Sequence, residues 1–347
     1  MGKTKEIAMF PARLRMHHRW LNPALLGIVF FSMVACSLAQ STAQRPSSAN
    51  KLLPGQQIWR KGVSSFLFGT NDSYEWSTHN IQTEPAIQLS LRTAGFTLIR
   101  SFFPDNASNS VIEQRVRTIE NSGAQCFGVI TNTADTVFDE HLVRYLGSRC
   151  LMYEFGNESD INGISIETYL ARWNALIPAL RHINPSAKFI GPVTYYDEGN
   201  HNYMHDFLVG VQQSGVLPDA ISYHMYACYN DTESACLAKA DRYAASAMWV
   251  HSLVKSILGK DLPVGISEWN YDPGNPPPSY GDNPQFITQY STRALLSMMQ
   301  GNLAFACQFD AADYGGYGRL DMFDTNNNQP KPQYYAISTL IQQYRPT

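Results

Sequence analysis

Two glutamates, Glu158 and Glu268, each follow a short apolar stretch that has the composition of a buried β-strand. Residues 151–155 continue into Gly-Asn-Glu, and residues 262–266 continue into Ser-Glu-Trp. A carboxylate carried towards a protein interior is costly unless it is paired or used, so the two residues indicate a functional site. Two carboxyl groups that face one another are the groups needed to cleave a glycosidic bond.

For these glutamates to meet, the chain must hold their strands side by side, and the hydrophobic pattern predicts an architecture that does so. Eight strand-like stretches alternate with helix-like stretches. The predicted strands are residues 65–69, 96–102, 124–130, 151–155, 187–193, 220–224, 262–268 and 303–309. The predicted helices are residues 84–94, 110–121, 136–146, 166–183, 203–213, 234–258, 285–299 and 334–343, with Ser165 as the N-cap of the fourth.

Alternation of this kind predicts an α/β fold with a parallel sheet and right-handed crossovers, and eight units predict a single (β/α)8 TIM barrel. The alternative is an open doubly wound sheet, which would need a glycine-rich phosphate-binding turn after the first strand. The segment Phe68-Gly69-Thr70-Asn71-Asp72 is not such a turn. In a closed barrel all strands end on one face, so Glu158 and Glu268 are predicted to share one opening. Strand alternation also predicts that Glu154, Gly156 and Glu158 share one face.

The N-terminal part of the chain has a different character from the rest. Residues 1–39 combine basic residues, a short apolar run and a small-residue exit at Ala39, which predicts a secretory signal peptide. Lipid attachment at Cys36 and an uncleaved membrane anchor are the alternatives. Residues 40–52 are predicted to be a flexible linker, so the barrel is assigned to residues 53–347. We expect a secreted or cell-surface protein.

The composition argues against several classes of partner. The formal net charge is −3, with no long basic run beyond the first twenty residues, so no nucleic-acid partner is expected. No Cys-x-x-Cys or His-Glu-x-x-His pattern occurs, so we expect no metal and no cofactor. We expect a monomer that contacts no membrane beyond a signal or lipid anchor.

Export would permit disulfide bonds. Cys228 and Cys236 bracket a polar loop and are the best candidate pair. Cys126, Cys150 and Cys307 lie in or beside apolar strands, and we expect them to be buried free thiols.

Several other predicted strands end in polar residues, and together they form a known pattern. Tyr153-Glu154-Phe155-Gly156-Asn157-Glu158 resembles the aromatic-Glu-x-x-Asn-Glu signature of clan A glycoside hydrolases, the retaining (β/α)8 enzymes that include cellulases, mannanases and xylosidases. Arg100 matches the strand-two arginine of that clan, and His224-Met225-Tyr226 matches its His-x-Tyr on strand six. The clan's strand-three histidine has no counterpart near Thr131-Asn132, and its strand-eight tryptophan is replaced near Phe309-Asp310. These departures leave the subfamily and the substrate open.

The resemblance implies roles for individual residues. Glu268 would be the nucleophile and Glu158 the acid/base. Substrate-binding roles around them are implied for Arg100, Asn157, His224 and Tyr226, and Trp269, which follows Glu268, is a further candidate to bind substrate. Arg100 would keep Glu268 ionised, Tyr226 would donate to the same carboxylate, Asn157 would hold the sugar 2-hydroxyl, and His224 would bond substrate or orient Glu158. Trp269 is expected to be either a sugar platform or a wall of the barrel, and Glu154 to be a buried partner of Arg100.

Loops on the same face supply candidate subsite residues, namely Asp72, Glu75, Trp76, Tyr195, Tyr196 and Asp310. We therefore expect a secreted retaining glycoside hydrolase that cleaves O-glycosidic, β-linked bonds of a polysaccharide or oligosaccharide. A transglycosylase would have the same residues. The alternatives from other classes are a non-catalytic carbohydrate-binding lipoprotein on the same scaffold and a barrel enzyme of unrelated chemistry. The sugar, the linkage and the choice between endo and exo attack stay open.

Overall fold

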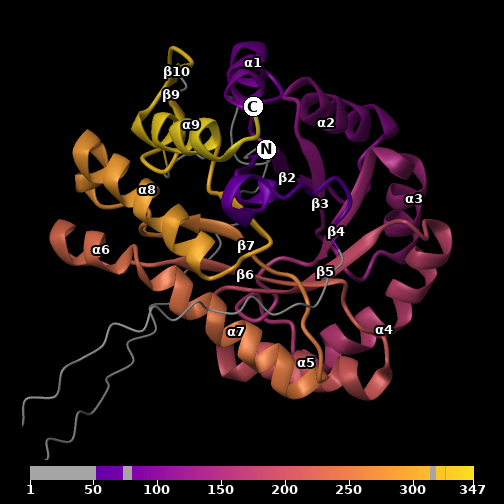
Figure 1. Ribbon diagram of the computed structural model, residues 1–347. Helices are drawn as coiled ribbons and strands as arrows, with labels where there is room; N and C mark the ends of the chain where they lie inside the picture. The colour runs from indigo at the N-terminus through magenta and orange to yellow at the C-terminus, as the bar shows by residue number, and fades with distance from the viewer. Residues whose placement is uncertain (1–51, 73–79, 313–317, 325) are drawn as a thin grey trace, which may run out of the picture. The chain divides into compact units, whose positions relative to one another are not determined.

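Strands and helices alternate around a closed barrel, as the hydrophobic pattern predicts (Figure 1). The computed structural model describes residues 52–72, 80–312, 318–324 and 326–347. The predicted signal peptide and all but the last residue of the predicted linker lie outside these residues. Eight parallel strands pair in chain order, and the first pairs with the eighth to close the ring. The fold is a single (β/α)8 barrel.

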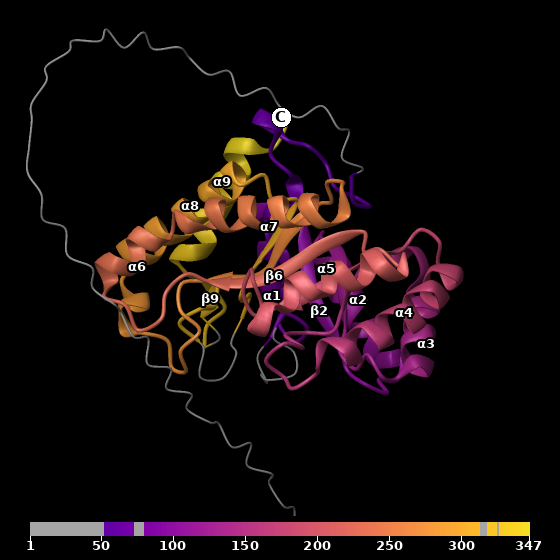
Figure 2. The same ribbon diagram turned by 90° about the horizontal axis from the view of Figure 1, so that it is seen from below.

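The structure sets the bounds of these elements. The barrel strands are β1 (Gly69–Asn71), β2 (Leu98–Phe103), β3 (Gln125–Ile130), β4 (Cys150–Phe155), β5 (Lys188–Thr194), β6 (Ala220–Tyr226), β7 (Val264–Asn270) and β8 (Phe305–Gln308). The helices are α1 (Pro85–Ala94), α2 (Asn109–Asn121), α3 (Thr136–Leu146), α4 (Ile166–Ile183), α5 (Tyr203–Ser214), α6 (Glu233–Lys239), α7 (Arg242–Leu258), α8 (Pro284–Gln300) and α9 (Pro332–Tyr344). A two-stranded hairpin, β9 (Phe323–Asp324) and β10 (Gln329–Pro330), precedes α9, and Figure 2 shows β9 and the C-terminus on opposite sides of the barrel.

The fourth helix shows how local sequence sets these bounds. Ser165 caps α4, because its side chain accepts a hydrogen bond from the backbone N–H of Thr168, as predicted. The buried residues of α4 recur at helical spacing, as in Tyr169, Trp173 and Leu176, so that one face packs against the strands. Among the described residues, no helix has both the length and the apolar character that a bilayer crossing requires.

Two predicted elements differ from the structure. The predicted first strand, residues 65–69, is wrong, because Ser65–Leu67 form a 3-10 turn that begins with a hydrogen bond from the Phe66 N–H to the Ser64 side chain. The predicted helix 234–258 is two helices. Ser297 of α8 bonds to the start of the second, because its hydroxyl donates to the Asp241 carbonyl and accepts from the Ala244 N–H in the first turn of α7. A tertiary contact of this kind leaves no signal in a helical hydrophobic pattern.

The interior of the barrel is layered. A buried apolar layer fills the lower part of the ring, and the polar site lies above it. Leu98 of β2 and Met152 of β4 belong to the apolar layer. Arg100 and Glu154 follow each of them by two residues, so strand alternation points these polar side chains to the same interior, one layer higher.

The structure contains two disulfides. Cys228 and Cys236 are joined, as predicted, and Cys307 is a buried free thiol, as predicted. The prediction of free thiols at Cys126 and Cys150 is wrong, because these two residues form a disulfide. They stand opposite one another on the neighbouring strands β3 and β4, with Cα atoms 4.9 Å apart. The bond depends on the register between β3 and β4, which the apolar pattern of either strand alone does not carry.

Removal of the Cys126–Cys150 disulfide should cost more stability than removal of Cys228–Cys236. The first spans 24 residues of sequence and the second spans 8, so the first restricts the unfolded chain more strongly. We expect the double alanine variant at Cys126 and Cys150 to lose about 3 kcal/mol of unfolding free energy, measured by urea denaturation. An unfolding midpoint equal to that of the parent protein would contradict this expectation, and the double variant at Cys228 and Cys236 is the matched comparison.

Candidate active site

The structure brings the two strand-end glutamates together. Glu158 follows β4 and Glu268 lies in β7, and a carboxylate oxygen of each lies within 4.8 Å of the other. Carboxyl groups about 5 Å apart are typical of retaining glycosidases, whereas inverting enzymes separate theirs by roughly 6.5–9.5 Å to admit a water molecule. The spacing therefore suits direct attack by one carboxylate on a sugar that the other protonates.

Glu158 reaches this position through the loop after β4. The strand ends at Phe155, and Gly156 and Glu158 have positive φ angles of 86° and 45°. The backbone N–H of Glu158 donates to the Val193 carbonyl at 2.9 Å, and the Glu158 carbonyl accepts from the N–H of Ile161. Glu158 lies on the predicted side of the barrel. The loop after β4 puts it there, and not the alternation of side chains along the strand, because the strand ends at Phe155.

Arg100 is the hub of the site. Its Nε donates to Glu154 Oε2 at 2.5 Å, and its Nη1 donates to Glu268 Oε1 at 2.7 Å. Its Nη1 and Nη2 also donate to the side-chain oxygens of Asn71 and Asn157, at 2.9 and 2.7 Å. The side chain is fully buried, and burial disfavours its charge, but the negative charges of Glu154 and Glu268 raise the pKa of Arg100 overall. A permanent cation therefore lies beside Glu268.

The second oxygen of Glu268 has its own donors. Tyr226 Oη donates to Glu268 Oε2 at 3.0 Å, and His224 Nδ1 lies 3.4 Å from the same oxygen. Phe309, at the end of β8, packs edge-on against the Tyr226 ring with centroids 6.3 Å apart. Donors on both oxygens suit a carboxylate anion fixed in one orientation.

Glu158 has a different environment. It is half-buried, and its Oε1 lies 2.7 Å from His224 Nδ1. Burial raises the pKa of Glu158 to about 7, and the negative charge of Asp160 adds to the effect while the charge of Arg100 opposes it. Burial also lowers the pKa of His224, so the ring is a neutral imidazole at pH 7. Two carboxyl groups in such different surroundings suit an acid and a nucleophile.

Three residues expected to bind substrate are enclosed in protein. Arg100 and His224 are fully buried, so they contact the carboxylates of Glu268 and Glu158 and not the solvent. Trp269 is 1% exposed, and its ring packs edge-on against Tyr243 of α7, which leaves no face for a sugar. The structure thus contradicts a platform role for Trp269. Glu268 points into the barrel, and side chains alternate along a strand, so Trp269 points outward to the helices.

Two of the expected residues stay at the opening. Asn157 is half-buried, and its side-chain oxygen is bound to Arg100, so its amide nitrogen is the group that could donate to a sugar hydroxyl. Tyr226 is 7% exposed and contacts Glu268 directly. Both lie beside the paired carboxyl groups, as their strand positions and the resemblance predict, and a substrate-binding role for either stays a prediction.

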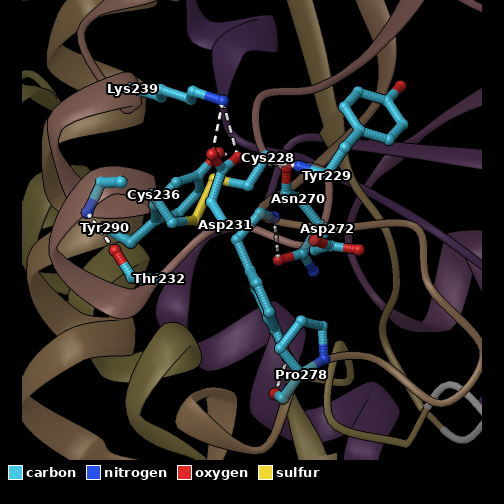
Figure 3. The surroundings of a disulfide bond; sticks show 12 residues. Cys228, Tyr229, Asp231, Thr232, Cys236, Lys239, Asn270, Asp272, Pro278 and Tyr290 are labelled. Carbon is cyan, nitrogen blue, oxygen red and sulfur yellow. Dashed lines mark hydrogen bonds and ion pairs between the residues drawn. A yellow bond between two sulfur atoms is a disulfide. The ribbon is translucent and has the colours of Figure 1, made fainter. Parts of the chain in front are cut away.

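Two of the loop residues predicted to form subsites line a cavity. Tyr195 and Tyr196 line a cavity of about 570 Å³ that also borders Tyr226, Tyr229 and Trp249. Figure 3 shows the Tyr229 ring extending away from the Cys228–Cys236 disulfide that anchors its loop.

The other proposed subsite residues do not line this cavity. Asp72 and Asp310 are buried, so neither presents a side chain to solvent. Glu75 and Trp76 lie outside the described residues.

Sequence reasoning missed two polar residues of the site. Asn71 ends β1, binds Arg100 and donates from its amide nitrogen to the Ser267 carbonyl at 3.0 Å, which ties β1 to β7. Asp160 lies two residues beyond Glu158 and is buried. A polar residue at the end of a short strand was the available signal for Asn71.

The site has no evident place for a resident metal. Among the described residues, Glu158, His224 and Glu268 form the one group of acidic, histidine and cysteine side chains close enough to share a cation. Their oxygens and the ring nitrogen already bond to one another and to Arg100 and Tyr226. A cation there would also lie against the Arg100 guanidinium, so we assign none.

Comparison with known proteins supports the fold. No family model matches the sequence, and no curated protein matches it. Solved structures do match. A glucosidase from Croceicoccus marinus has a TM-score of 0.61 and 19% identity, covering 80% of this chain and 67% of its own. A monomeric β-xylosidase from Caulobacter crescentus has a TM-score of 0.60 and 16% identity, covering 79% and 67%. A family 51 α-L-arabinofuranosidase from Bifidobacterium longum has a TM-score of 0.60 and 9% identity, covering 80% and 73%. The chain therefore shares the barrel fold of these three glycosidases.

Proposed function

We propose that this protein is a retaining glycoside hydrolase in which Glu268 is the nucleophile and Glu158 the acid/base. The observation that carries the proposal is the close pair of carboxyl groups in contrasting environments. Glu268 receives donors from Arg100 and Tyr226, while burial and Asp160 raise the pKa of Glu158 to about 7. The shared fold with a glucosidase, a β-xylosidase and an arabinofuranosidase supports the same reaction class.

The first half of the reaction forms a bond between sugar and enzyme. A Glu268 oxygen attacks the anomeric carbon while Glu158 gives its proton to the glycosidic oxygen, so the leaving group departs as an alcohol. A His224 tautomer with hydrogen on Nδ1 donates to Glu158 Oε1 and leaves Oε2 to carry the proton. The Asn157 amide nitrogen is placed to hold a hydroxyl next to the anomeric carbon, a contact that strengthens in the transition state.

The second half releases the sugar. Glu158, now a carboxylate, takes a proton from a water molecule, and the water oxygen attacks the anomeric carbon. The bond to Glu268 breaks, and its carboxylate returns to Arg100 and Tyr226. Two displacements on opposite faces restore the original anomeric configuration, so retention of configuration is the stereochemical signature of this mechanism.

The substrate we propose is a β-linked polysaccharide or oligosaccharide outside the cytoplasm. Two disulfides suit an exported protein, because such bonds persist in oxidising compartments. The cavity lined by Tyr195, Tyr196 and Tyr229 reaches Tyr226, which is bonded to Glu268. Tyrosine and tryptophan rings in that cavity offer faces on which a sugar ring can stack.

A substrate panel with product analysis tests the proposal. Aryl β-glucosides, β-xylosides and α-L-arabinofuranosides would be assayed together with β-linked polysaccharides, and the first-formed anomer would be read by proton NMR. Retention of configuration supports the proposed mechanism, and inversion contradicts it. Binding of a polysaccharide in affinity electrophoresis without turnover of any substrate would instead favour a non-catalytic carbohydrate-binding protein.

The proposed acid should give the enzyme an alkaline limit near pH 7. The reactive free enzyme has Glu158 protonated, and this form is lost as the pH rises through its pKa of about 7. We therefore expect kcat/KM to fall roughly tenfold for each pH unit above that value. The pH profile of kcat/KM measures this limb, and a profile that stays flat to pH 9 would contradict the assignment of Glu158.

A further inference from the structure

We propose that Asp160 is a positioning residue that fixes the Glu158 loop against the loop after β5. The inference rests on the proposed function, since it gives a role to a residue beside the proposed acid. It begins from an unusual placement, because Asp160 is only 9% exposed and lies two residues beyond Glu158. A buried carboxylate that touches no substrate needs another role to offset its burial.

The bonds of Asp160 join two loops. Its Oδ1 accepts from the backbone N–H of Tyr195 at 3.2 Å, and its Oδ2 accepts from the backbone N–H of Asn200 at 2.9 Å. The Asn200 side chain returns a hydrogen bond to the Asp160 carbonyl at 3.2 Å. The loop after β4 is thereby fastened to the loop after β5, which carries Tyr195 of the aromatic cavity.

A second contact beside these bonds explains why fastening is needed. The Glu158 N–H donates to the Val193 carbonyl, and both residues have left-handed backbones, with φ angles of 45° and 58°. Such conformations cost about 1–3 kcal/mol each for residues other than glycine, so the surrounding structure must stabilise them. Asp160 lies two residues from Glu158, and its partner Tyr195 lies two residues from Val193, so their hydrogen bond supports both strained residues. Without this bond the Glu158 side chain would lose its fixed position.

The charge of Asp160 also acts on Glu158. The groups bonded to Asp160 are uncharged N–H donors, so its negative charge is not cancelled by a bonded cation. The other groups that face Glu158 from packed elements are Arg100 of β2, Glu268 of β7, His224 and Tyr226 of β6, and Tyr229 of the following loop. Arg100 favours the carboxylate form of Glu158, and Asp160 favours the protonated form.

The test is the Asp160→Asn variant, which keeps the size of the side chain and removes its charge. The pKa of Glu158 would be measured by carbon-13 NMR on protein with labelled glutamate carboxyls, with Glu158→Gln used to assign the signal. We expect this pKa to fall by about one pH unit in Asp160→Asn, and the alkaline limb of kcat/KM to move with it. Glu198→Gln removes an exposed charge from the same loop as Tyr195 and should leave both values unchanged.

Two further results decide the inference. Asp160→Glu keeps the charge on a longer side chain, so the pKa of Glu158 should stay near 7 while kcat falls at least tenfold at every pH. This variant serves as the test if Asp160→Asn does not fold, and a wild-type kcat in it would overturn the positioning role. An unchanged Glu158 pKa in folded Asp160→Asn would overturn the electrostatic role. Because the NMR titration needs no turnover, absence of glycosidase activity would reject the proposed function and leave this inference to its own result.

Discussion

Replacement of Glu268 by alanine should lower kcat/KM for an aryl β-glycoside by roughly 10⁴-fold or more, because no other described group can attack the anomeric carbon from that position. The neighbouring Arg100 and Tyr226 bond to the oxygens that the variant removes. The loss should appear in kcat as well as in kcat/KM, since the missing bond is made only during the reaction. Steady-state kinetics on the parent protein and the variant measure it.

Azide makes this result specific to the nucleophile. The small anion can enter the space vacated by the carboxylate and attack the anomeric carbon once, giving a glycosyl azide of inverted configuration that NMR identifies. Glu140→Gln, an exposed glutamate of α3 paired only loosely with Arg144 at 3.7 Å, is the matched control and should keep wild-type rates. A Glu268→Ala variant that retained a tenth of the parent activity would exclude the proposed mechanism.

The second large effect concerns stability. Replacing Arg100 by methionine should lower the unfolding free energy by roughly 3–5 kcal/mol, because it leaves the buried carboxylates of Glu154 and Glu268 without their cation. Urea denaturation at pH 7 measures the loss. Adding Glu154→Gln to Arg100→Met should recover part of it, since the double variant removes one of the two unpaired charges.

Arg149 provides the control for this experiment. Like Arg100 it pairs with two glutamates, Glu113 and Glu120, but about a third of its side chain is exposed. Water and salt screen such a pair, so Arg149→Met should cost only about 1 kcal/mol. Equal losses in the two variants would mean that burial does not distinguish the Arg100 network from a surface ion pair.

The fold and the meeting of the principal candidate residues could be predicted because both follow from short-range patterns, whereas the roles of those residues stay predictions from the resemblance. Apolar stretches of strand length alternate with helical periodicity, and eight such units fit only a few architectures. Polar residues at the ends of those stretches must then meet on one face. This reasoning brought Arg100, Glu158, Tyr226 and Glu268 together before any coordinates were considered, and the structure places them in direct or near contact.

The features that escaped prediction depend on contacts between distant segments. The Cys126–Cys150 bond requires the register of β3 on β4, and the new start of the chain's helix at α7 is bonded to Ser297 of another helix. Asp160 gave no local signal, because its importance lies in the N–H groups of a loop 35 residues away. The burial of Trp269 differs from these features, because it could have been predicted: Trp269 follows the inward-facing Glu268, and alternation along the strand turns it outward.

The ion pairs of Arg100 also set the net charge beside the two paired carboxyl groups. One guanidinium pairs with two carboxylates, and Glu158 is neutral in its acid form, so these four side chains together carry one negative charge. In the proposed reaction, an oxocarbenium-like transition state would bring positive charge to these side chains, whereas the bound sugar would bring none. The negative charge would therefore stabilise the transition state of the proposed reaction more than it stabilises the bound substrate.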